Sequence, residues 1–250
     1  HYCGRLKKRS FTIYLTEYRR SRFAMLPLVV KNILIINVLF FIAMHVNPIL
    51  HEYIIKYGAA FYFDSPLFRI WQLITYAFLQ YDIGHIFFNM FAVFMFGSVI
   101  ENYLGSKRFF SYYMITAIGA MVLQLALSAY QVYQLTGSFI PYTQEMDITN
   151  PVVMAKIQGI YSTPTIGASG AVFGLLLAFG LLFPESLLYV YFFFPIKAKY
   201  FVIIYGAIEL WMGIANRPGD NVAHYAHLGG MLFGFILLKV WKIRKPGSYY

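Results

Sequence analysis

The feature that most limits how this chain can fold is a series of six apolar stretches with few charged residues. Only 12% of the 250 residues are charged, whereas soluble domains average about 25%, so lipid must be the surrounding solvent. Runs this long and continuous predict helices rather than barrel strands, because lipid offers the backbone no hydrogen bonds. We therefore expect an all-α membrane protein with six transmembrane helices. The stretches cover residues 28–46, 85–104, 109–130, 168–183, 199–214 and 222–241.

The charges between these stretches predict the topology. Cytoplasmic flanks of membrane helices carry an excess of Lys and Arg. Such residues gather in the N-terminal tail and at 107–108, 197–199 and 242–245. Placing all four groups on the inner side requires an even number of crossings, which six helices satisfy. The three outer segments then carry four basic residues against six acidic ones, so both termini are expected in the cytoplasm.

The same flanks explain the formal net charge of +10, because they set the topology and contact anionic membrane lipids. No nucleic-acid partner is expected. The chain is predicted to consist of a basic cytoplasmic tail (1–27), one six-helix domain (28–241) and a second basic cytoplasmic tail (242–250). The first outer segment, 47–84, is apolar enough to lie in the membrane interface. Gly and Pro residues predict a looser outer loop over 131–165.

Three polar groupings lie inside the apolar stretches, where polar side chains are costly and usually functional. They are His85 with Asn89, Ser169 in the sequence Gly-Ala-Ser-Gly, and His227 in the sequence Ala-His-Leu-Gly-Gly. Each has a structural alternative when taken alone. A helical serine can bond back to a carbonyl, His85 can be an interfacial residue, and Asn89 can join two helices.

Topology favours a functional interpretation, because all four side chains fall at similar depth below the outer surface. Each lies near the outer end of its helix, and His227 is about five residues in, or roughly 8 Å deep. Glycines give the helices a way to converge. Two pairs with GxxxG spacing, at 170/174 and 230/234, reduce one face of the fourth and sixth helices to backbone. Ser169 and His227 can then come within hydrogen-bonding distance.

The chemistry of these residue types assigns their roles. A serine hydroxyl needs a base to become a nucleophile, and a histidine has a suitable pKa. Ser169 at a helix start has free backbone N–H groups nearby for an oxyanion, and His85 and Asn89 add side-chain donors. No carboxylate is expected at this depth. Asp220 and Glu209 are weak candidates for a third member, so a Ser–His dyad is predicted.

His224 is a competing base, one turn before His227. The glycine pair that follows His227 and its greater depth favour His227 instead. His224 is expected near the outer mouth of the site, hydrogen-bonded or in contact with water.

The three motifs together, on the second, fourth and sixth helices, resemble those of the rhomboid intramembrane serine proteases, and the resemblance runs from about residue 28 onward. It implies a six-helix fold with a water-filled cavity, transmembrane protein substrates, and no cofactor or metal. It also implies Ser169 as nucleophile, His227 as general base, and an oxyanion hole of His85, Asn89 and the Ser169 amide. The supporting residues would be Phe173, which packs on the catalytic histidine, with Gly167, Gly170 and Gly230. Glu101 with Leu104-Gly105-Ser106 matches a structural motif at the inner end of the second helix.

Three positions depart from the family pattern: Gln72 where arginine often follows tryptophan, Gln80 where a further histidine is common, and Tyr103 in place of an arginine. These departures bear on loop stability rather than on catalysis. Two alternatives stay open, namely a catalytically silent rhomboid-like protein that binds membrane clients and a small transporter. The expected location is a bacterial inner membrane with the site opening to the periplasmic or extracellular side. The oligomeric state is left open.

Overall fold

A computed structural model describes residues 26–190, 193–215 and 223–247 of the chain. The basic N-terminal tail, Asp220 and the end of the C-terminal tail lie outside these residues. Within them the prediction of an all-α membrane fold is confirmed. Four helical stretches are long and apolar enough to cross a membrane, and two shorter apolar helices complete the expected six. The four are α2 (Leu28–Val46), the continuous run α5–η2–α6 (Ile83–Leu104), α7 (Ser106–Thr136) and α10 (Ala198–Ala215); the shorter two are α9 (Ser169–Leu182) and α11 (His224–Val240).

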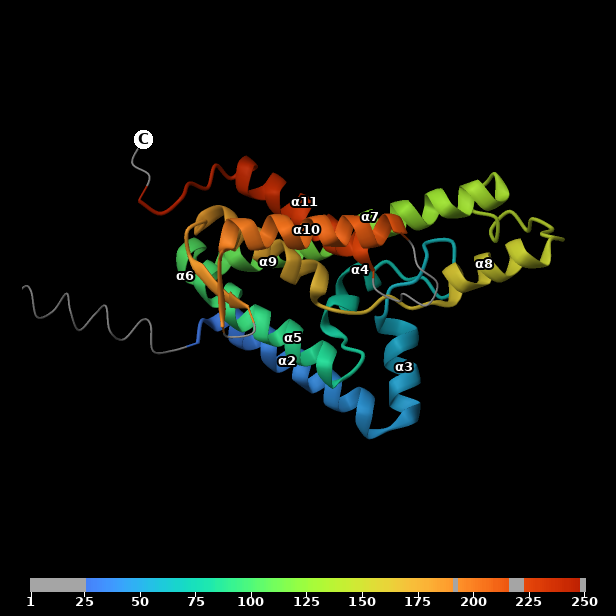
Figure 1. Ribbon diagram of the computed structural model, residues 1–250. Coiled ribbons are helices and arrows are strands. Elements are labelled where there is room, and N and C mark those ends of the chain that lie inside the picture. Colours follow the sequence, from blue (N-terminus) through green and yellow to red (C-terminus); the bar gives the residue numbers. More distant parts are fainter. Residues whose placement is uncertain (1–25, 191–192, 216–222, 248–250) are drawn as a thin grey trace, which may run out of the picture.

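The short helix α9 forms the centre of the bundle (Figure 1). Of its 14 residues 11 are buried, and it packs against α7, α10 and α11. A helix of 14 residues is only about 21 Å long, too short for the ~30 Å of lipid hydrocarbon. It is tolerated here because its neighbours rather than lipid surround it.

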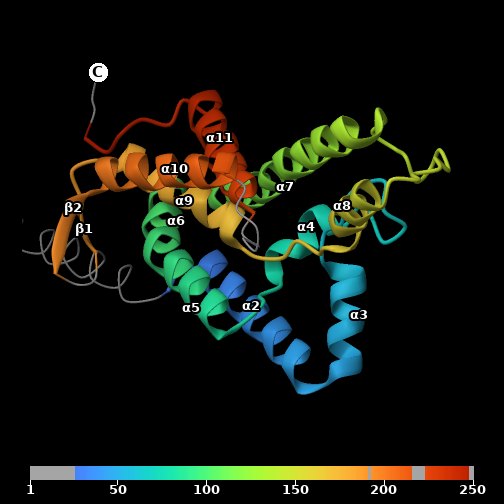
Figure 2. The same cartoon turned by 45° about the vertical axis from the view of Figure 1, so that its right-hand side comes forward.

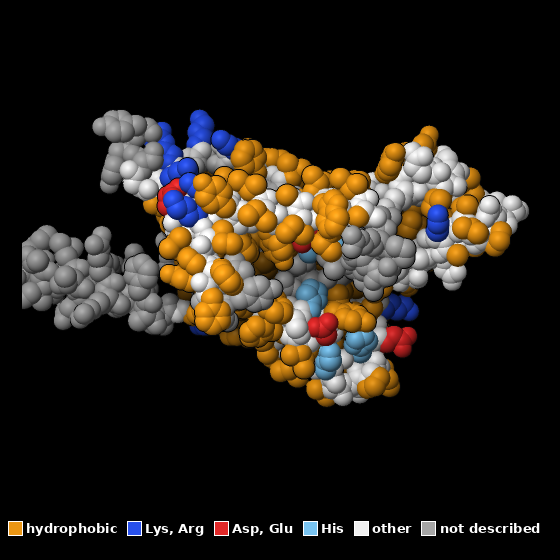
Figure 3. Space-filling view, viewed as in Figure 1, with side chains coloured by type: hydrophobic (Ala, Val, Ile, Leu, Met, Phe, Trp, Pro, Cys, Tyr) orange, Lys and Arg blue, Asp and Glu red, His pale blue; other side chains and the backbone are white. Residues whose placement is uncertain are grey.

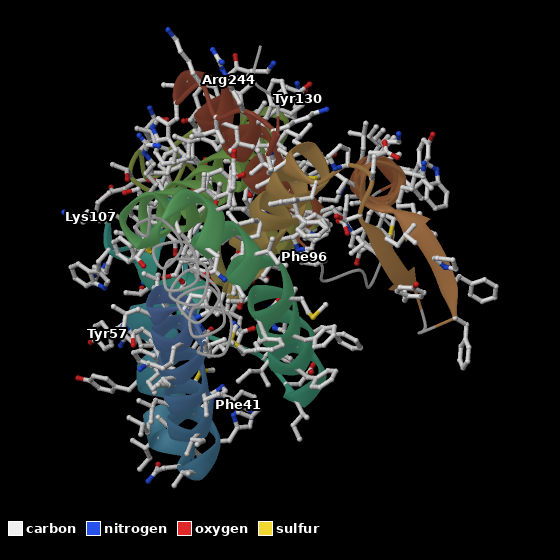
Figure 4. All side chains as sticks on the ribbon, turned by 90° about the vertical axis from the view of Figure 1, so that its left-hand side faces the viewer. Phe41, Tyr57, Phe96, Lys107, Tyr130 and Arg244 are labelled. Atoms are coloured by element: carbon white, nitrogen blue, oxygen red, sulfur yellow. The ribbon has the colours of Figure 1, made fainter. Side chains whose placement is uncertain are left out.

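The second transmembrane stretch contains a turn of π-helix. α5 (Ile83–Ala92) and α6 (Ser98–Leu104) are joined by η2 (Val93–Gly97). Viewed from the end where Lys107 and Arg244 lie, Phe96 of η2 projects between this stretch and α9 (Figure 4), where its ring is 5.1 Å from that of Phe179. The inserted residue of a π-turn re-aims side chains, and here it directs aromatic packing toward the central helix.

Glu101 holds together the end of the bundle where α2 begins. Its buried carboxylate accepts hydrogen bonds from the backbone N–H groups of Val29 (3.0 Å) and Val30 (2.8 Å) and from the Ser106 hydroxyl (2.7 Å). The N–H groups of a first helical turn have no intrahelical acceptor, so this carboxylate caps α2 from another helix. Gly105, at φ +80°, makes the turn into α7 that brings Ser106 back to it.

The first outer segment folds into α3 (Pro48–Gly58), α4 (Gln72–Thr75) and η1 (Tyr76–Phe78). Gln72 organises this segment. Its side chain accepts from the Arg69 N–H (2.9 Å) and donates to the carbonyls of Lys56 (3.2 Å) and Leu67 (3.0 Å). An amide thus holds the loop where the family often has arginine. The interfacial position of the segment stays a prediction.

The expectation of a loose outer loop over 131–165 is wrong in part. α7 continues to Thr136, and α8 spans Pro151–Ser162, so that both extend past the rest of the bundle (Figure 1). The loop that joins them forms the right-hand tip of the molecule in Figure 2. Asn150 and Pro151 begin α8 rather than break it. The Asn150 side chain accepts from the N–H groups of Val152 and Val153, and proline is favoured in a first helical turn because its missing N–H is not needed there.

A two-stranded antiparallel hairpin is a further element that the sequence patterns did not predict. β1 (Leu187–Val190) pairs with β2 (Phe194–Lys197), with Leu187 opposite Lys197. The hairpin lies at the end of the molecule where α2 begins and α11 ends (Figure 1), and Lys and Arg side chains gather near the same end (Figure 3). This arrangement agrees with an even number of crossings. Which side of a membrane this end faces stays a prediction.

Candidate active site

Ser169 and His227 meet at the centre of the candidate site. Ser169 is the first residue of α9, and His227 lies in the first turn of α11. The Ser169 Oγ and the His227 Nε2 are 2.9 Å apart, which is a hydrogen bond. His227 is buried, whereas Ser169 is partly exposed. The pair therefore has a protected ring nitrogen and an accessible hydroxyl.

Glycines make this meeting possible. A Cβ added to Gly230 would lie 1.8 Å from the carbonyl oxygen of Gly170, and one added to Gly234 would lie 3.4 Å from the Cα of Gly174. α9 and α11 are therefore in backbone contact along both glycine pairs. Close approach of this kind is what small residues at four-residue spacing permit. It brings Ser169 and His227, each within three residues of the contact, to bonding distance.

Gly167 shapes the entry to α9. Its φ of +132° is a conformation that side chains rarely adopt, and a Cβ there would lie 2.8 Å from the His85 Nε2 and 3.6 Å from the Ser169 Oγ. Its N–H donates to the carbonyl of Tyr76 (3.0 Å), whose own hydroxyl donates to the Ala117 carbonyl (2.7 Å). The loop before Ser169 is thus tied to the first outer segment and to α7.

His85 is held beside this loop in one tautomer. The Asp82 side chain caps α5 by accepting from the His85 N–H (2.8 Å), and the Tyr81 N–H donates to the His85 Nδ1 (3.1 Å). Since Nδ1 accepts, a neutral ring carries its proton on Nε2. Nε2 is the nitrogen that faces Gly167. The side chain therefore presents a donor next to Ser169.

Asn89 lies one turn further along α5 and belongs to a buried chain of amides. Its Nδ2 donates to the Gln80 Oε1 (2.8 Å), the Gln80 Nε2 donates to the Asn37 Oδ1 (2.7 Å), and Asn37 donates to the Ile33 carbonyl (2.8 Å). The recorded partner of Asn89 is thus Gln80 and not Ser169. Gln80, which the sequence marked only as a departure in a loop, is a fixed neighbour of the site.

An aromatic stack supports the histidine. The Phe173 ring lies 4.2 Å from the His227 ring at an interplanar angle of 8°, and 5.2 Å from the Tyr205 ring at 22°. Phe173 is one turn after Ser169 on α9, and Tyr205 is on α10. The stack therefore joins three helices and fixes the plane of the imidazole.

The expectation that no carboxylate lies at this depth is wrong. Glu209 of α10 is buried, and its Oε2 is 2.8 Å from the His227 Nδ1. The opposite nitrogen of the same ring is the one bonded to Ser169. A carboxylate, an imidazole and a hydroxyl thus form one hydrogen-bonded line across α10, α11 and α9.

The expected place of His224 at the outer mouth is wrong as well. Its side chain is buried, and its Nδ1 is 2.6 Å from the same Glu209 oxygen. The two histidine rings are 6.3 Å apart and nearly perpendicular, at 87°. His224 therefore belongs to the interior of the site, beside Glu209.

A signal for Glu209 was present in the sequence. α10 ends at Ala215, so Glu209 lies six residues, or about 9 Å, below that end. This equals the depth expected for His227 to within one residue. Glu209 is a weak candidate in the sequence because it stands near an outer end of its helix, yet His227 stands equally near such an end.

Comparisons with known proteins find matches to one family. A family model described as the Rhomboid domain matches residues 67–242. The chain is 34% identical over 170 residues to the Arabidopsis thaliana "RHOMBOID-like protein 12, mitochondrial", and 30% identical over 176 residues to the Saccharomyces cerevisiae "Rhomboid protein 1, mitochondrial". It is 26% identical over 185 residues to the Bacillus subtilis "Rhomboid protease GluP".

These matches cover 65%, 70% and 72% of this chain, respectively, but only 44%, 42% and 27% of the three relatives. The chain thus spans less than half the length of these curated relatives. The family match at residues 67–242 extends over the helices that carry the site.

Proposed function

Since the chain belongs to the rhomboid family, we propose that it is an intramembrane serine endopeptidase with Ser169 as nucleophile and His227 as general base. The observation that carries this proposal is the 2.9 Å hydrogen bond between the Ser169 Oγ and the His227 Nε2. A serine becomes nucleophilic when a base accepts its proton. The Bacillus subtilis relative is a rhomboid protease by name, which supports the same activity.

The first half of the reaction follows from this geometry. The Ser169 oxygen attacks a substrate carbonyl carbon while its proton moves to the His227 Nε2. The negative charge that develops on the carbonyl oxygen is stabilised by donors aimed at it. The first backbone bond within α9 is donated by Val172, so the amide groups before it have no intrahelical acceptor. The proton on the His85 Nε2 adds a side-chain donor.

The second half returns the proton and consumes water. His227 gives its proton to the leaving amine, the peptide bond breaks, and an acyl-enzyme ester on Ser169 remains. A water molecule then attacks the ester while His227 again accepts a proton. The ester bond breaks as His227 returns that proton to the Ser169 oxygen, which releases the carboxyl-terminated product. Asn89 contributes by fixing the position of its helix through Gln80 (2.8 Å). A second role for Asn89 as an oxyanion donor stays a proposal.

The substrate class we propose is the transmembrane segment of another membrane protein. The protein is itself an integral membrane protein, and its candidate site lies among membrane helices. A helical substrate hides its carbonyls in its own hydrogen bonds, so the segment must unwind near the cut. Residues with low helix propensity are therefore expected around the scissile bond.

The proposal is tested with purified protein in proteoliposomes and a fluorescent transmembrane substrate. Ser169→Ala and His227→Ala are expected to abolish cleavage and labelling by a fluorophosphonate probe, with melting temperatures close to that of the wild type. Ser162→Ala is the matched control, because Ser162 bonds only its own helix and is exposed. Full cleavage by Ser169→Ala would refute the assignment. Binding of substrate without cleavage by the wild type would favour the catalytically silent alternative.

A location in a bacterial inner membrane, with both termini cytoplasmic, stays our prediction, supported by the basic end of the bundle (Figure 3). The mitochondrial names of two relatives offer a different membrane. Reporter fusions distinguish the orientations. A fusion after residue 247 is expected to report the cytoplasmic side, and an insertion near residue 147 the outer side. The reverse pattern would refute this orientation.

A further inference from the structure

We propose that Glu209 is a positioning residue that holds the His227 ring with its basic nitrogen toward Ser169, so that the site works as a Ser–His–Glu triad. This inference rests on the proposed function and changes one part of it. The expected reaction needed only two residues. The geometry adds a third residue on a third helix, and it gives a role to a buried carboxylate that would otherwise be costly.

The contact with Glu209 determines which tautomer His227 adopts. An ionised carboxylate can only accept hydrogen bonds. With Glu209 Oε2 at 2.8 Å from Nδ1, the proton of the neutral ring must be on Nδ1. Nε2 then has a free lone pair, and it faces the Ser169 Oγ at 2.9 Å. This is the tautomer that can accept the serine proton.

Glu209 also acts on the charge that forms during the reaction. When His227 accepts the serine proton, it becomes an imidazolium in an environment with little water. Glu209 lies against its Nδ1–H and stabilises that cation without taking the proton itself, as acids in such triads do. The proton therefore moves only between the serine oxygen, Nε2 and the leaving amine. The balance of protons is the same as in the two-residue mechanism.

Two histidines hold the buried Glu209 carboxylate in place. His224 and His227 are three residues apart, so both rings lie on one face of α11. Both direct Nδ1 at the same Glu209 oxygen, at 2.6 Å and 2.8 Å. Two N–H donors offset much of the cost of burying the charge. His224 thus orients Glu209, which in turn orients His227.

The same three side chains could instead bind a divalent cation, because their ligand-type atoms all lie within 4.8 Å of one another. A zinc ion keeps its ligand nitrogens at about 2.0–2.1 Å. Two ligand atoms of the same ion are held further from each other than a hydrogen bond allows. Here the oxygen is at hydrogen-bonding distance from both nitrogens. A metal on the His227 Nδ1 would also leave the proton on Nε2, where it blocks the reaction. The hydrogen-bonded arrangement is therefore the one we argue.

The deciding variant is Glu209→Gln, which keeps the shape of the side chain and removes its charge. The glutamine amide can donate to Nδ1 as well as accept from it, so it no longer imposes one tautomer. We expect kcat to fall by at least ~10²-fold, in line with the ~10⁴-fold effect of the equivalent change in a serine protease triad. KM should change by less than about threefold, since substrate binding does not involve this contact. The matched control is Glu185→Gln, because Glu185 is an exposed carboxylate that bonds Lys197 and Lys199 away from the site.

A second readout does not depend on activity. In wild-type proteoliposomes, ¹⁵N solid-state NMR of labelled histidine is expected to show His227 protonated on Nδ1 and bare on Nε2. Glu209→Gln should convert this to a mixture of tautomers. If Glu209→Gln does not fold, Glu209→Asp is measured instead. It keeps the charge but withdraws the carboxylate by about one C–C bond, ~1.5 Å, and should also lower kcat.

The possible results separate the hypotheses. The proposal would be overturned if Glu209→Gln keeps the wild-type kcat, including the case in which its melting temperature falls but the folded fraction keeps that kcat. Glu209 would then serve only to join α10 to α11. A change in wild-type activity or in the NMR spectrum on adding EDTA would overturn it in favour of a metal. If the wild type neither cleaves nor takes up the fluorophosphonate, the proposed protease function fails. The tautomer measurement then still decides whether Glu209 positions His227.

Discussion

Replacement of Gly230 by alanine tests the idea that backbone contact between α9 and α11 sets the catalytic distance. The added Cβ would lie 1.8 Å from the Gly170 carbonyl oxygen and 2.7 Å from its carbonyl carbon. Real Cβ atoms essentially never come closer than 3.0 Å to another heavy atom. Both obstructing atoms belong to backbone, so no side chain can rotate out of the way. The two helices must separate.

The size of the separation can be worked out from these distances. Moving the Cβ from 1.8 Å to 3.0 Å requires the helices to part by about 1.2 Å. Ser169 directly precedes Gly170, and His227 is three residues before Gly230, so the catalytic pair shares this displacement. The Oγ–Nε2 distance would grow from 2.9 Å to about 4 Å, beyond hydrogen bonding. A misplacement of ~1 Å can cost ~10²-fold in rate.

The assay is cleavage of the transmembrane substrate in proteoliposomes, together with the rate of fluorophosphonate labelling and the melting temperature. Gly230→Ala is expected to lower both rates by about 10²-fold or more. Gly229→Ala distinguishes misalignment of the catalytic side chains from general destabilisation. Its Cβ would clash with α7, at 2.9 Å from the Ala120 Cα, and not with α9. It should cost stability while the folded fraction keeps more activity than Gly230→Ala.

Gly206→Ala serves as the benign control, because its Cβ meets only the flexible end of Met231, at 3.2 Å. It should leave activity unchanged and raise helix stability by about 0.5–1 kcal/mol. Wild-type activity in Gly230→Ala would refute the reasoning. Equal losses in Gly229→Ala and Gly230→Ala would show that the contact matters for stability alone.

Two further predictions concern carboxylates away from the site. Glu101→Gln should lower the melting temperature, because a neutral amide replaces the carboxylate that caps α2 and hydrogen bonds to charged groups are worth about 1.5–3 kcal/mol each. The measurement is thermal unfolding, with the surface variant Glu52→Gln as the control. Equal melting temperatures for the two variants would contradict the capping role. Hydrogen bonds from Lys197 and then from Lys199 lower the pKa of Glu185 to about 2. These ion pairs should therefore persist as pH falls through 4 and be lost only near the lowered pKa. In an NMR titration, the midpoint of the Glu185 carboxyl should return to its ordinary value when both lysines are replaced by alanine. An ordinary midpoint in the wild type would contradict the pairing.

The helical framework was largely predictable from the sequence. Each expected stretch corresponds to a helix whose ends agree within a few residues, with α7 as the exception at its outer end. The reason is physical, since lipid demands long apolar helices and charged flanks mark where they stop. The glycine spacing likewise indicated which two helices approach each other, because small residues four apart let helix backbones come close together.

The misses have two causes. The hairpin β1–β2 consists of short apolar runs. Such runs are compatible with a strand or with a helix, and only the tertiary context decides between them. Glu209 and His224 were misplaced because a sequence does not show which face of a helix meets which neighbour. Their contact depends on the rotation of α10 about its axis, and that rotation is set by packing, including the Tyr205–Phe173 stack.

The short length of α9 has a consequence for the supply of water. Hydrolysis consumes one water molecule per bond, and water is scarce within a bilayer. A central helix about 9 Å shorter than the hydrocarbon layer cannot reach both of its surfaces, so the proposed reaction needs a path for water to the first residue of α9. Under the proposed function, the length of α9 would set how far below the surface a substrate is cut, and lengthening the helix by one turn would raise the cut by about 5 Å.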